Sequence, residues 1–318
     1  MNRHLRIALL LALISLPGAA TAAEVQTLWD NDTDAFVPGP GGTDWNYTQG
    51  TRVNLFGAPG ALPAPGRWVA DRLPGFEASG GQRQFGFSIG QEIYTPRAIT
   101  ARKPVHGDRP YAGWLYASSI LSRRDARRMR SLELQIGTTG SASHAEDVQR
   151  WWHRKFGVRA PQGWQYQLRG EPGIVLSYQE RLRPWGYRRH ADFVPHAGVT
   201  LGNVHTEANA GGTVRLGLPL PDDFGPWRNA PAKPARRGFH LTLFARAEVR
   251  AVARNLFLDG NTFGTSLHVT RIPIVGEAQL GVTGRWRGLG FRYTFSHTTP
   301  EFRERPVKQE YGSFAIVI

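Results

Sequence analysis

The sequence predicts an all-β protein: a twelve-stranded antiparallel transmembrane β-barrel with one short helix in an extracellular loop. Three observations support this fold class. Apolar and polar residues alternate along many short segments, which is the pattern of strands with one apolar face. The chain of 318 residues is rich in glycine and aromatic residues and holds only two methionines. After the N-terminus, no segment approaches about 18 uninterrupted apolar residues, so we expect no membrane-spanning helix.

The first residues have the composition of an export signal. "MNRHLR" is basic, "IALLLALISL" is apolar and "PGAATAA" is rich in small residues, which is the order of a secretory signal peptide. Ala20-Thr21-Ala22 fits a cleavage site, so we assign residues 1–22 to a signal peptide and 23–318 to one outer-membrane barrel. A retained N-terminal anchor is the alternative, although the apolar run is too short to span a bilayer as a helix.

The charge of the chain favours an anionic partner. Removal of residues 1–22 leaves 37 basic and 25 acidic residues, a net charge of +12. Such an excess suits nucleic acid, a phosphate-bearing lipid or an acidic glycan, and export argues against nucleic acid. A solvated basic surface is the alternative. The sequence has no cysteine, which excludes disulfides and thiolate metal sites.

Twelve segments show the strand pattern. "LGFRYTFS" (289–296) alternates strictly, and in "FHLTLFARAEVR" (239–250) the face opposite the apolar one carries charged residues, as a polar lumen requires. An even number of strands suits a closed barrel with both ends on one side. The predicted strands cover residues 24–31, 47–57, 82–93, 111–122, 127–138, 166–183, 190–204, 209–218, 239–251, 271–284, 286–297 and 310–318.

The connections between these strands differ in length. Short links at "RRDARR" and around Arg285 are predicted as periplasmic turns. Proline and glycine are frequent in the longer connections. We expect the longer connections to be extracellular loops, at residues 58–81, 97–110, 139–165, 219–237 and 298–309.

One segment, "SHAEDVQRWWHRKFG", lacks strand alternation and predicts a helix. Ser143 fits an N-cap with Glu146 three residues later, and Gly157 fits the C-terminal end. Gln149 and His153 are one turn apart, so they share a face of this helix. The alternative is a helix that merely plugs the loop, with His153 as a polar surface residue.

The stretch "WDNDTDAF" begins at Trp29 and concentrates acids near the start of the mature chain. The oxygens of Asp32 and Asn31 suit a hard cation such as Ca²⁺. On a regular strand these two side chains point in opposite directions, so a bulge or turn is needed for both to serve one site. The spacing Asp30-x-Asp32-x-Asp34 resembles the start of an EF-hand, but the later Gly and Glu are missing, so we reject that motif. A solvated loop rich in Asp and Asn is the alternative.

Several motifs together carry a family resemblance. They occur in order along the first 180 residues: "WDND", "YTQG" (Tyr47–Gly50), "GQEIYTP" (Gly90–Pro96), "DRPYAGWLY" (Asp108–Tyr116), "VQRWWH" and "PQGWQYQL" (Pro161–Leu168). With these motifs the chain resembles the LpxR-type lipid A deacylase family of outer-membrane barrels. The C-terminal half matches only as alternating strands.

The resemblance implies a twelve-stranded barrel in the bacterial outer membrane, which we expect to be a monomer. Members of the family remove the 3′-linked acyloxyacyl group from the lipid A of lipopolysaccharide. The reaction that the resemblance implies is a Ca²⁺-dependent ester hydrolysis at a site near the outer-leaflet end of the lumen. It involves no nucleic acid.

Matched motif by motif, the resemblance also implies the site residues: catalytic His153, Gln149, Thr48 and Asn31, metal ligands Asp32 and Asn31, and substrate-binding Lys103 with Arg102 as its near alternative. His153 would be the general base, since imidazole titrates near neutral pH. Thr48 could be a ligand, a donor to the oxyanion or a nucleophile. The absence of a G-x-S-x-G motif favours water as the attacking group. The phosphates of lipid A could bind Arg109, Arg154 and Arg159 as well.

One departure from the family pattern leaves alternatives open. The resemblance implies a Glu shortly after the His, but "RKFGVRAPQG" holds none, and Glu171 is the next acid. A barrel with lost or altered activity, acting as a structural or pore protein, is therefore the second hypothesis. An outer-membrane phospholipid esterase and a soluble basic β-protein are the third and fourth.

Overall fold

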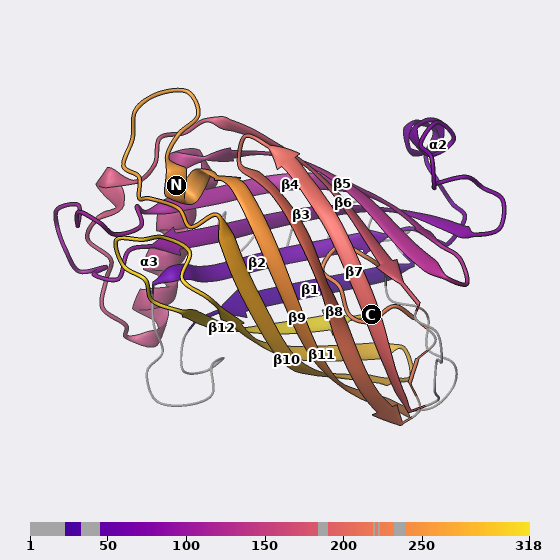
Figure 1. Cartoon of the computed structure of the whole chain (residues 1–318). Coiled ribbons are helices and arrows are strands. Elements are labelled where there is room, and N and C mark those ends of the chain that lie inside the picture. Colours follow the sequence, from indigo (N-terminus) through magenta and orange to yellow (C-terminus); the bar gives the residue numbers. More distant parts are fainter. Residues whose placement is uncertain (1–22, 33–44, 184–189, 219, 222, 232–238) are drawn as a thin grey trace.

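The computed structural model describes residues 23–32, 45–183, 190–218, 220–221, 223–231 and 239–318. Within these ranges, twelve antiparallel strands close into one barrel (Figure 1). Each strand pairs with its sequence neighbours, and β1 (Glu24–Asn31) pairs with β12 (Gln309–Val317) to close the wall. The predicted fold class is therefore confirmed. The predicted signal peptide, residues 1–22, lies outside the described residues.

The predicted strands match the observed ones in number and order. The largest difference is at the start of β6, because Trp164–Tyr166 forms the short 3-10 helix η3 instead of strand. The other strands are β2 (Asn46–Phe56), β3 (Gln82–Thr95), β4 (Ala112–Arg124), β5 (Arg128–Thr139), β6 (Pro172–Leu182), β7 (Ala191–Gly202), β8 (His205–Leu218), β9 (Phe239–Asn255), β10 (Ile274–Trp286) and β11 (Leu289–Thr298).

Helices occupy only the connections. In the described part of the chain, no helix is both long enough and apolar enough to cross a membrane. They are α2 (Ala64–Ala70), η2 (Gly140–Ser143), α3 (Ala145–Phe156), η3 and α4 (Leu256–Asp259).

Side chains alternate between an apolar outer face and a polar lumen. Phe87, Ile136 and Leu280 lie on the outer face and are exposed. In the lumen, the buried Arg52 guanidinium donates to the buried Glu133 carboxylate over 2.8 Å. Buried charges need such partners, because an unpaired one costs several kcal/mol, of the order of 3–5. The polar lumen predicted from the charged strand faces is thus confirmed.

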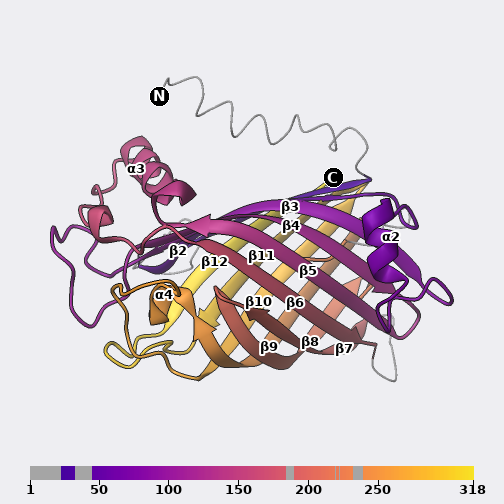
Figure 2. The same cartoon turned by 90° about the horizontal axis from the view of Figure 1, so that it is seen from above.

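The two ends of the barrel carry different elements. α3 and α4 lie at one end, whereas α2 lies at the end where β12 finishes (Figures 1 and 2). The turns before β5 and β11 lie at this second end, the terminus end, as predicted. The prediction was wrong for the β2–β3 and β8–β9 connections, which also lie at the terminus end. In an up-and-down barrel every even strand returns to the end where β1 starts, so strand parity decides the end and connection length does not.

The β8–β9 connection turns into the lumen. We call its described residues 223–231 the luminal segment. Arg228 of this segment forms an ion pair with Asp30 of β1. The side chain of Asn54 in β2 donates to the Arg228 carbonyl over 2.8 Å. The first two strands therefore hold the luminal segment inside the barrel.

Trp227 fixes the luminal segment to more distant strands. Its ring lies 4.2 Å from the guanidinium carbon of Arg181 in β6 and 3.9 Å from that of Arg246 in β9, both cation–π contacts. Arg246 also donates to the Pro226 carbonyl over 2.8 Å. A polar cavity of about 380 Å³ remains in the lumen beside the segment. The segment thus obstructs the lumen from the terminus end.

Candidate active site

The predicted helix forms as α3, but it begins differently from the prediction. Ser143 belongs to η2, and its hydroxyl donates to the Gly140 carbonyl over 2.5 Å instead of capping α3. His144, with φ of 55°, precedes the first helical residue and makes no side-chain cap. The capping box is therefore wrong, because Ser143 is buried against the barrel wall. Gly157, with φ of 69°, ends the helix as predicted.

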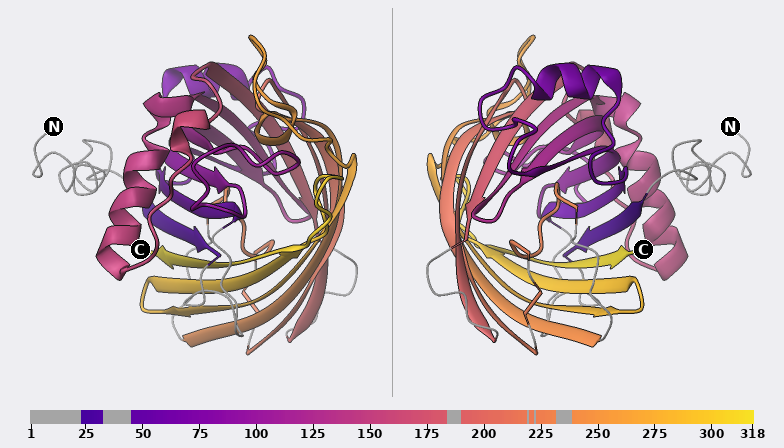
Figure 3. Two further views of the ribbon diagram at one scale, coloured as in Figure 1. Left: turned by 90° about the vertical axis from the view of Figure 1, so that its left-hand side faces the viewer. Right: turned by 90° about the vertical axis from the view of Figure 1, so that its right-hand side faces the viewer.

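α3 lies on the outer face of the barrel wall (Figure 3). Its first residue, Ala145, packs with the outward side chain of Ile93 in β3. At Gly113 of β4 a Cβ would come within 2.3 Å of the Ala145 Cβ, so only glycine allows this close approach. Near the far end of the helix, the Trp152 ring meets the outward Trp29 ring of β1 at 6.1 Å. α3 therefore crosses from β4 towards β1 on the outer face.

This placement corrects the expectation of a site near the end of the lumen. Asp30 and Tyr47 line the luminal cavity, whereas Asn31, Thr48 and His153 do not. Strand alternation gives the reason, since Asp30 points inward and its neighbour Asn31 must then point outward. Asn31, Thr48 and His153 therefore lie outside the luminal cavity, whereas Lys103 and Arg102 lie in the β3–β4 connection.

Gln149 and His153 lie on the face of α3 that is turned towards the wall. They follow Ala145 by one and two turns, and all three are buried. Trp152, the residue before His153, contacts Trp29 of β1. The second half of α3 therefore lies over the outer face near the end of β1, where Asn31 follows Trp29 by two residues.

Two hydrogen bonds fix the polar side chains of α3. The Trp164 indole N–H donates to Oε1 of Gln149 over 2.8 Å. Nδ1 of His153 is 2.5 Å from the carbonyl oxygen of Arg159. A carbonyl can only accept, so Nδ1 carries the proton and Nε2 of the neutral ring holds the lone pair. The two bonds orient both side chains before any substrate binds.

The strand ends beneath α3 are irregular. The register shifts between Tyr47 and Gln49, which places a bulge at Thr48. The backbone N–H of Asp32 donates to the Thr48 carbonyl over 3.3 Å, and the hydroxyls of Thr48 and Thr95 are 2.7 Å apart. This bulge lies in β2 and not in the Asn31–Asp32 segment for which a bulge or turn was predicted. β1 ends at Asn31, so Asp32 lies beyond the strand.

The acids of "WDNDTDAF" do not form one cluster. Asp30 points into the lumen, where it accepts from the Tyr47 hydroxyl over 2.6 Å and from Ser313 over 2.7 Å. Asp32 accepts from the Trp45 backbone N–H over 2.8 Å. Asp34 lies outside the described residues. Asp30 therefore has a structural role in the lumen, separate from the outer site.

The donor set at the strand ends fits a hard cation in ligand type. Asp32, Asn31 and Thr48 offer carboxylate, amide and hydroxyl oxygens, which Ca²⁺ accepts. Among the residues described here, no three His, Asp or Glu side chains gather in a way that could hold a metal ion. Within the described residues, Asp32 would offer a Ca²⁺ ion one carboxylate, and Asn31 and Thr48 would offer neutral oxygens.

Lys103 and Arg102 lie in the connection between β3 and β4 at the α3 end, and both are exposed. The Gln165 side chain donates to the Arg102 carbonyl over 3.2 Å, next to Trp164. Lys103 lines a small pocket of about 80 Å³. Arg109 of the same connection was also considered for phosphate binding. It is not available to substrate, because it is buried in an ion pair with Glu301 at 2.7 Å.

Comparison with known proteins identifies the family. A family model described as outer membrane protein LpxR matches residues 5–318. The chain belongs to the LpxR family. LpxR from Salmonella typhimurium has the same fold, with a TM-score of 0.75 and 22% identity over 93% of this chain and 99% of that one. The beta domain of the Bordetella autotransporter BrkA has a TM-score of 0.43 and 12% identity, over 93% and 98% of the two chains. Among curated proteins, no match was found.

Family membership confirms the resemblance and the location in the outer membrane. α3 then lies at the extracellular end, and the terminus end faces the periplasm.

Glu171 does not take the place of the acid that the LpxR resemblance implies after His153. Its carboxylate accepts from the Asn261 side chain over 2.9 Å and from the Thr262 backbone N–H over 2.9 Å. Burial raises its pKa, but the hydrogen bonds from Asn261 and Thr262 lower it more, and the net shift is downward. Glu171 thus ties the β9–β10 connection to the start of β6.

Three groups at this site in the LpxR-family barrel were not predicted from the sequence. Trp164 orients Gln149, the Arg159 carbonyl orients His153, and Thr95 pairs with Thr48. Trp164 and Thr95 could have been predicted, since both lie in motifs that carry the resemblance. Thr95 also shares a strand face with Ile93. No residue-type pattern marks a backbone carbonyl such as that of Arg159.

Proposed function

We propose that this LpxR-family barrel is a lipid A deacylase that hydrolyses the 3′-linked acyloxyacyl ester, with His153 as the general base. The observation that carries the proposal is the hydrogen bond between His153 Nδ1 and the Arg159 carbonyl. It sets the tautomer in which Nε2 can accept a proton, and it does so on the buried face of α3.

The location of the site supports a lipid substrate. α3 packs on the outer wall at the extracellular end, so a lipid of the outer leaflet reaches the site without leaving the membrane. A site inside the lumen would instead require the acyl chains to cross a polar cavity. Exposed Lys103 and Arg102 at the same end suit the phosphates of the lipid A headgroup.

In the proposed reaction, Nε2 of His153 removes a proton from water as the water oxygen attacks the ester carbonyl. The carbonyl oxygen becomes an oxyanion. The C–O bond to the sugar then breaks, and His153 returns the proton to the sugar oxygen, giving the free fatty acid and an alcohol. Oε1 of Gln149 accepts from the Trp164 indole, and this bond orients the Gln149 amide beside His153.

Asp32 and Asn31 are the residues that would hold Ca²⁺ in this proposal. When bound, the ion supplies positive charge next to the ester carbonyl. Thr48, fixed by Thr95, serves as a further oxygen ligand or as a donor, and water is the nucleophile.

Asp32→Ala tests this proposal, with mass spectrometry of lipid A as the measurement. We expect the natural protein to remove one acyloxyacyl chain in a Ca²⁺-dependent reaction. Asp32→Ala should lower the rate by at least about tenfold, because a ligand is lost, while the barrel still folds. Asp147→Ala, an exposed acid on α3, is the control and should retain full activity.

Two outcomes would count against the proposal. Full turnover of Asp32→Ala with the same calcium dependence would show that Asp32 is no ligand. Release of fatty acid from glycerophospholipid, with lipid A unchanged, would favour the phospholipid esterase.

A further inference from the structure

The β2–β3 connection, residues 57–81, lies against the outer face of the barrel at the periplasmic end (Figure 2). Gly66 of α2 sits directly on Phe85 of β3, where a Cβ would come within 2.8 Å of the ring. Val69 and Leu73 pack into the same apolar cluster as Leu121 of β4. The connection thus covers strand surface that would otherwise face lipid.

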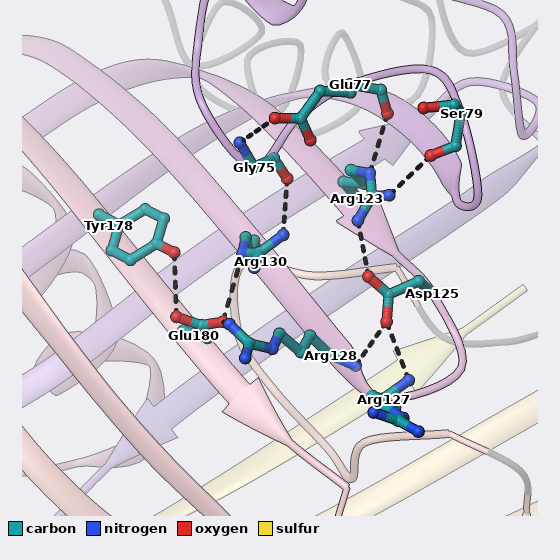
Figure 4. A network of polar contacts seen from close by, with 10 residues as sticks. All are labelled: Gly75, Glu77, Ser79, Arg123, Asp125, Arg127, Arg128, Arg130, Tyr178 and Glu180. Carbon is teal, nitrogen blue, oxygen red and sulfur yellow. Dashed lines mark hydrogen bonds and ion pairs between the residues drawn. The ribbon is translucent and has the colours of Figure 1, made fainter.

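Arginines of the wall hold the irregular backbone of this connection (Figure 4). Arg123 donates to the carbonyls of Glu77 and Ser79, each over 2.9 Å. Arg130 donates to the Gly75 carbonyl over 2.8 Å. Irregular backbone beside lipid needs partners for its polar groups, since hydrocarbon offers none. These bonds allow the connection to lie at the boundary between hydrocarbon and headgroups.

The exposed side of the connection combines an aromatic side chain with cations. Trp68 is 60% exposed, and the Arg72 guanidinium carbon lies 4.4 Å from the centre of its ring. Tryptophan is enriched at the level of lipid headgroups because its ring is amphipathic. Arg67 is exposed on the same helix, and Arg72 follows the end of α2. This side of the connection therefore exposes one aromatic ring and two cations.

The surrounding surface is strongly basic. Three of its four carboxylates are in ion pairs: Asp71 with Arg83, Asp125 with Arg123, and Glu180 with Arg128 and Arg130. The fourth, that of Glu77, accepts from the Gly75 backbone N–H over 2.7 Å. Arg128 remains about half exposed, and Arg127 is exposed beside it. On this surface, seven arginines accompany four carboxylates: Arg67, Arg72, Arg83, Arg123, Arg127, Arg128 and Arg130 against Asp71, Glu77, Asp125 and Glu180.

We propose that this α2 surface binds the headgroups of anionic phospholipids in the periplasmic leaflet. Trp68 lies at the interface, and Arg67, Arg72, Arg127 and Arg128 contact the phosphates. Charge complementarity selects an anionic lipid over a zwitterionic one, at about 1 kcal/mol, or about fivefold in affinity, for each arginine. The site is independent of deacylation, because α3 lies at the opposite end of the barrel.

The chain contains a matched control on the opposite wall. Trp286, at the end of β10, is 56% exposed, and Arg287 lies 4.9 Å from its ring. This pair also lies at the periplasmic end. It has the same tryptophan–arginine chemistry as α2, but among the described residues no helical connection packs beside it.

Native mass spectrometry of the full barrel, released from detergent with phosphatidylglycerol or phosphatidylethanolamine, tests the proposal. We expect preferential retention of phosphatidylglycerol. The double substitution Arg72→Gln/Arg128→Gln should weaken it by about 30-fold, and Arg287→Gln should leave it unchanged. Arg67→Gln/Arg127→Gln is a second variant of exposed residues, in case the first does not fold.

Three results would overturn the proposal. They are equal retention of the two lipids, an equal loss in Arg287→Gln, and no loss in either double variant. Binding of a periplasmic protein that the double variants abolish, without any lipid preference, would assign the surface to a protein partner instead.

Discussion

His153→Ala lowers the rate of lipid A deacylation by about 10²- to 10⁴-fold, the usual contribution of a general base. The loss should exceed that of any other single change at the site, because no second imidazole lies on the buried face of α3 within the described residues. The rate is measured on purified protein by mass spectrometry of lipid A. Heat-modifiable electrophoretic mobility checks that the barrel is folded.

The control for this experiment is His190→Ala. His190 is exposed before β7 at the periplasmic end, so its loss should leave the rate unchanged. If His153→Ala retains most of its activity, the role of His153 as the base is wrong. The second hypothesis, an inactive barrel, predicts that neither the natural protein nor any variant changes lipid A.

Asp30→Ala opens the lumen to ions, whereas the natural barrel conducts little current in a planar bilayer. Asp30 is buried and forms an ion pair with Arg228 of the luminal segment. Its carboxylate also accepts from the hydroxyls of Tyr47 and Ser313. Because the Arg228 side chain is partly exposed, loss of its partner costs less than the roughly 3–5 kcal/mol of a fully buried ion pair, but it removes the bond that holds the segment. The segment should therefore leave the lumen for part of the time, and single-channel recordings should show new conductance steps.

Asp71→Ala is the matched control for the conductance measurement. Asp71 also pairs with an arginine, Arg83, but on the outer surface, so its loss should leave the conductance unchanged. A large conductance of the natural protein would contradict the obstruction of the lumen and would support a pore function. Identical recordings for Asp30→Ala and the natural protein would show that Asp30 does not hold the segment.

The alternation of apolar and polar residues was enough to predict the barrel, because successive side chains in a strand point to opposite faces of the wall. The same rule places Asp30 in the lumen and Asn31 outside, and it could have separated the acids of "WDNDTDAF" in advance. A different rule, strand parity, fixes the end of the barrel at which each connection lies. The wrong assignment of the β2–β3 and β8–β9 connections came from using connection length instead of strand parity.

The position of α3 could not be predicted from local sequence. The helix itself follows from its lack of strand alternation and from Gly157. Its docking on the outer wall depends on Gly113, which lies more than thirty residues earlier, and on the contact between Trp29 and Trp152. Such tertiary contacts have no local pattern. They also removed Ser143 from its predicted capping role.

The central claim is that α3 lies on the membrane side of the wall, so that His153 faces the outer ends of β1 and β2. Cysteine cross-linking tests it cleanly, since the chain has no cysteine of its own. Trp29 and Trp152 contact each other at 6.1 Å between ring centres, whereas Leu28 lines the luminal cavity. With a short bifunctional thiol reagent, Trp29→Cys/Trp152→Cys should cross-link within one chain, and Leu28→Cys/Trp152→Cys should not. Cross-linking of the Leu28 pair in place of the Trp29 pair would put α3 over the lumen and contradict the account.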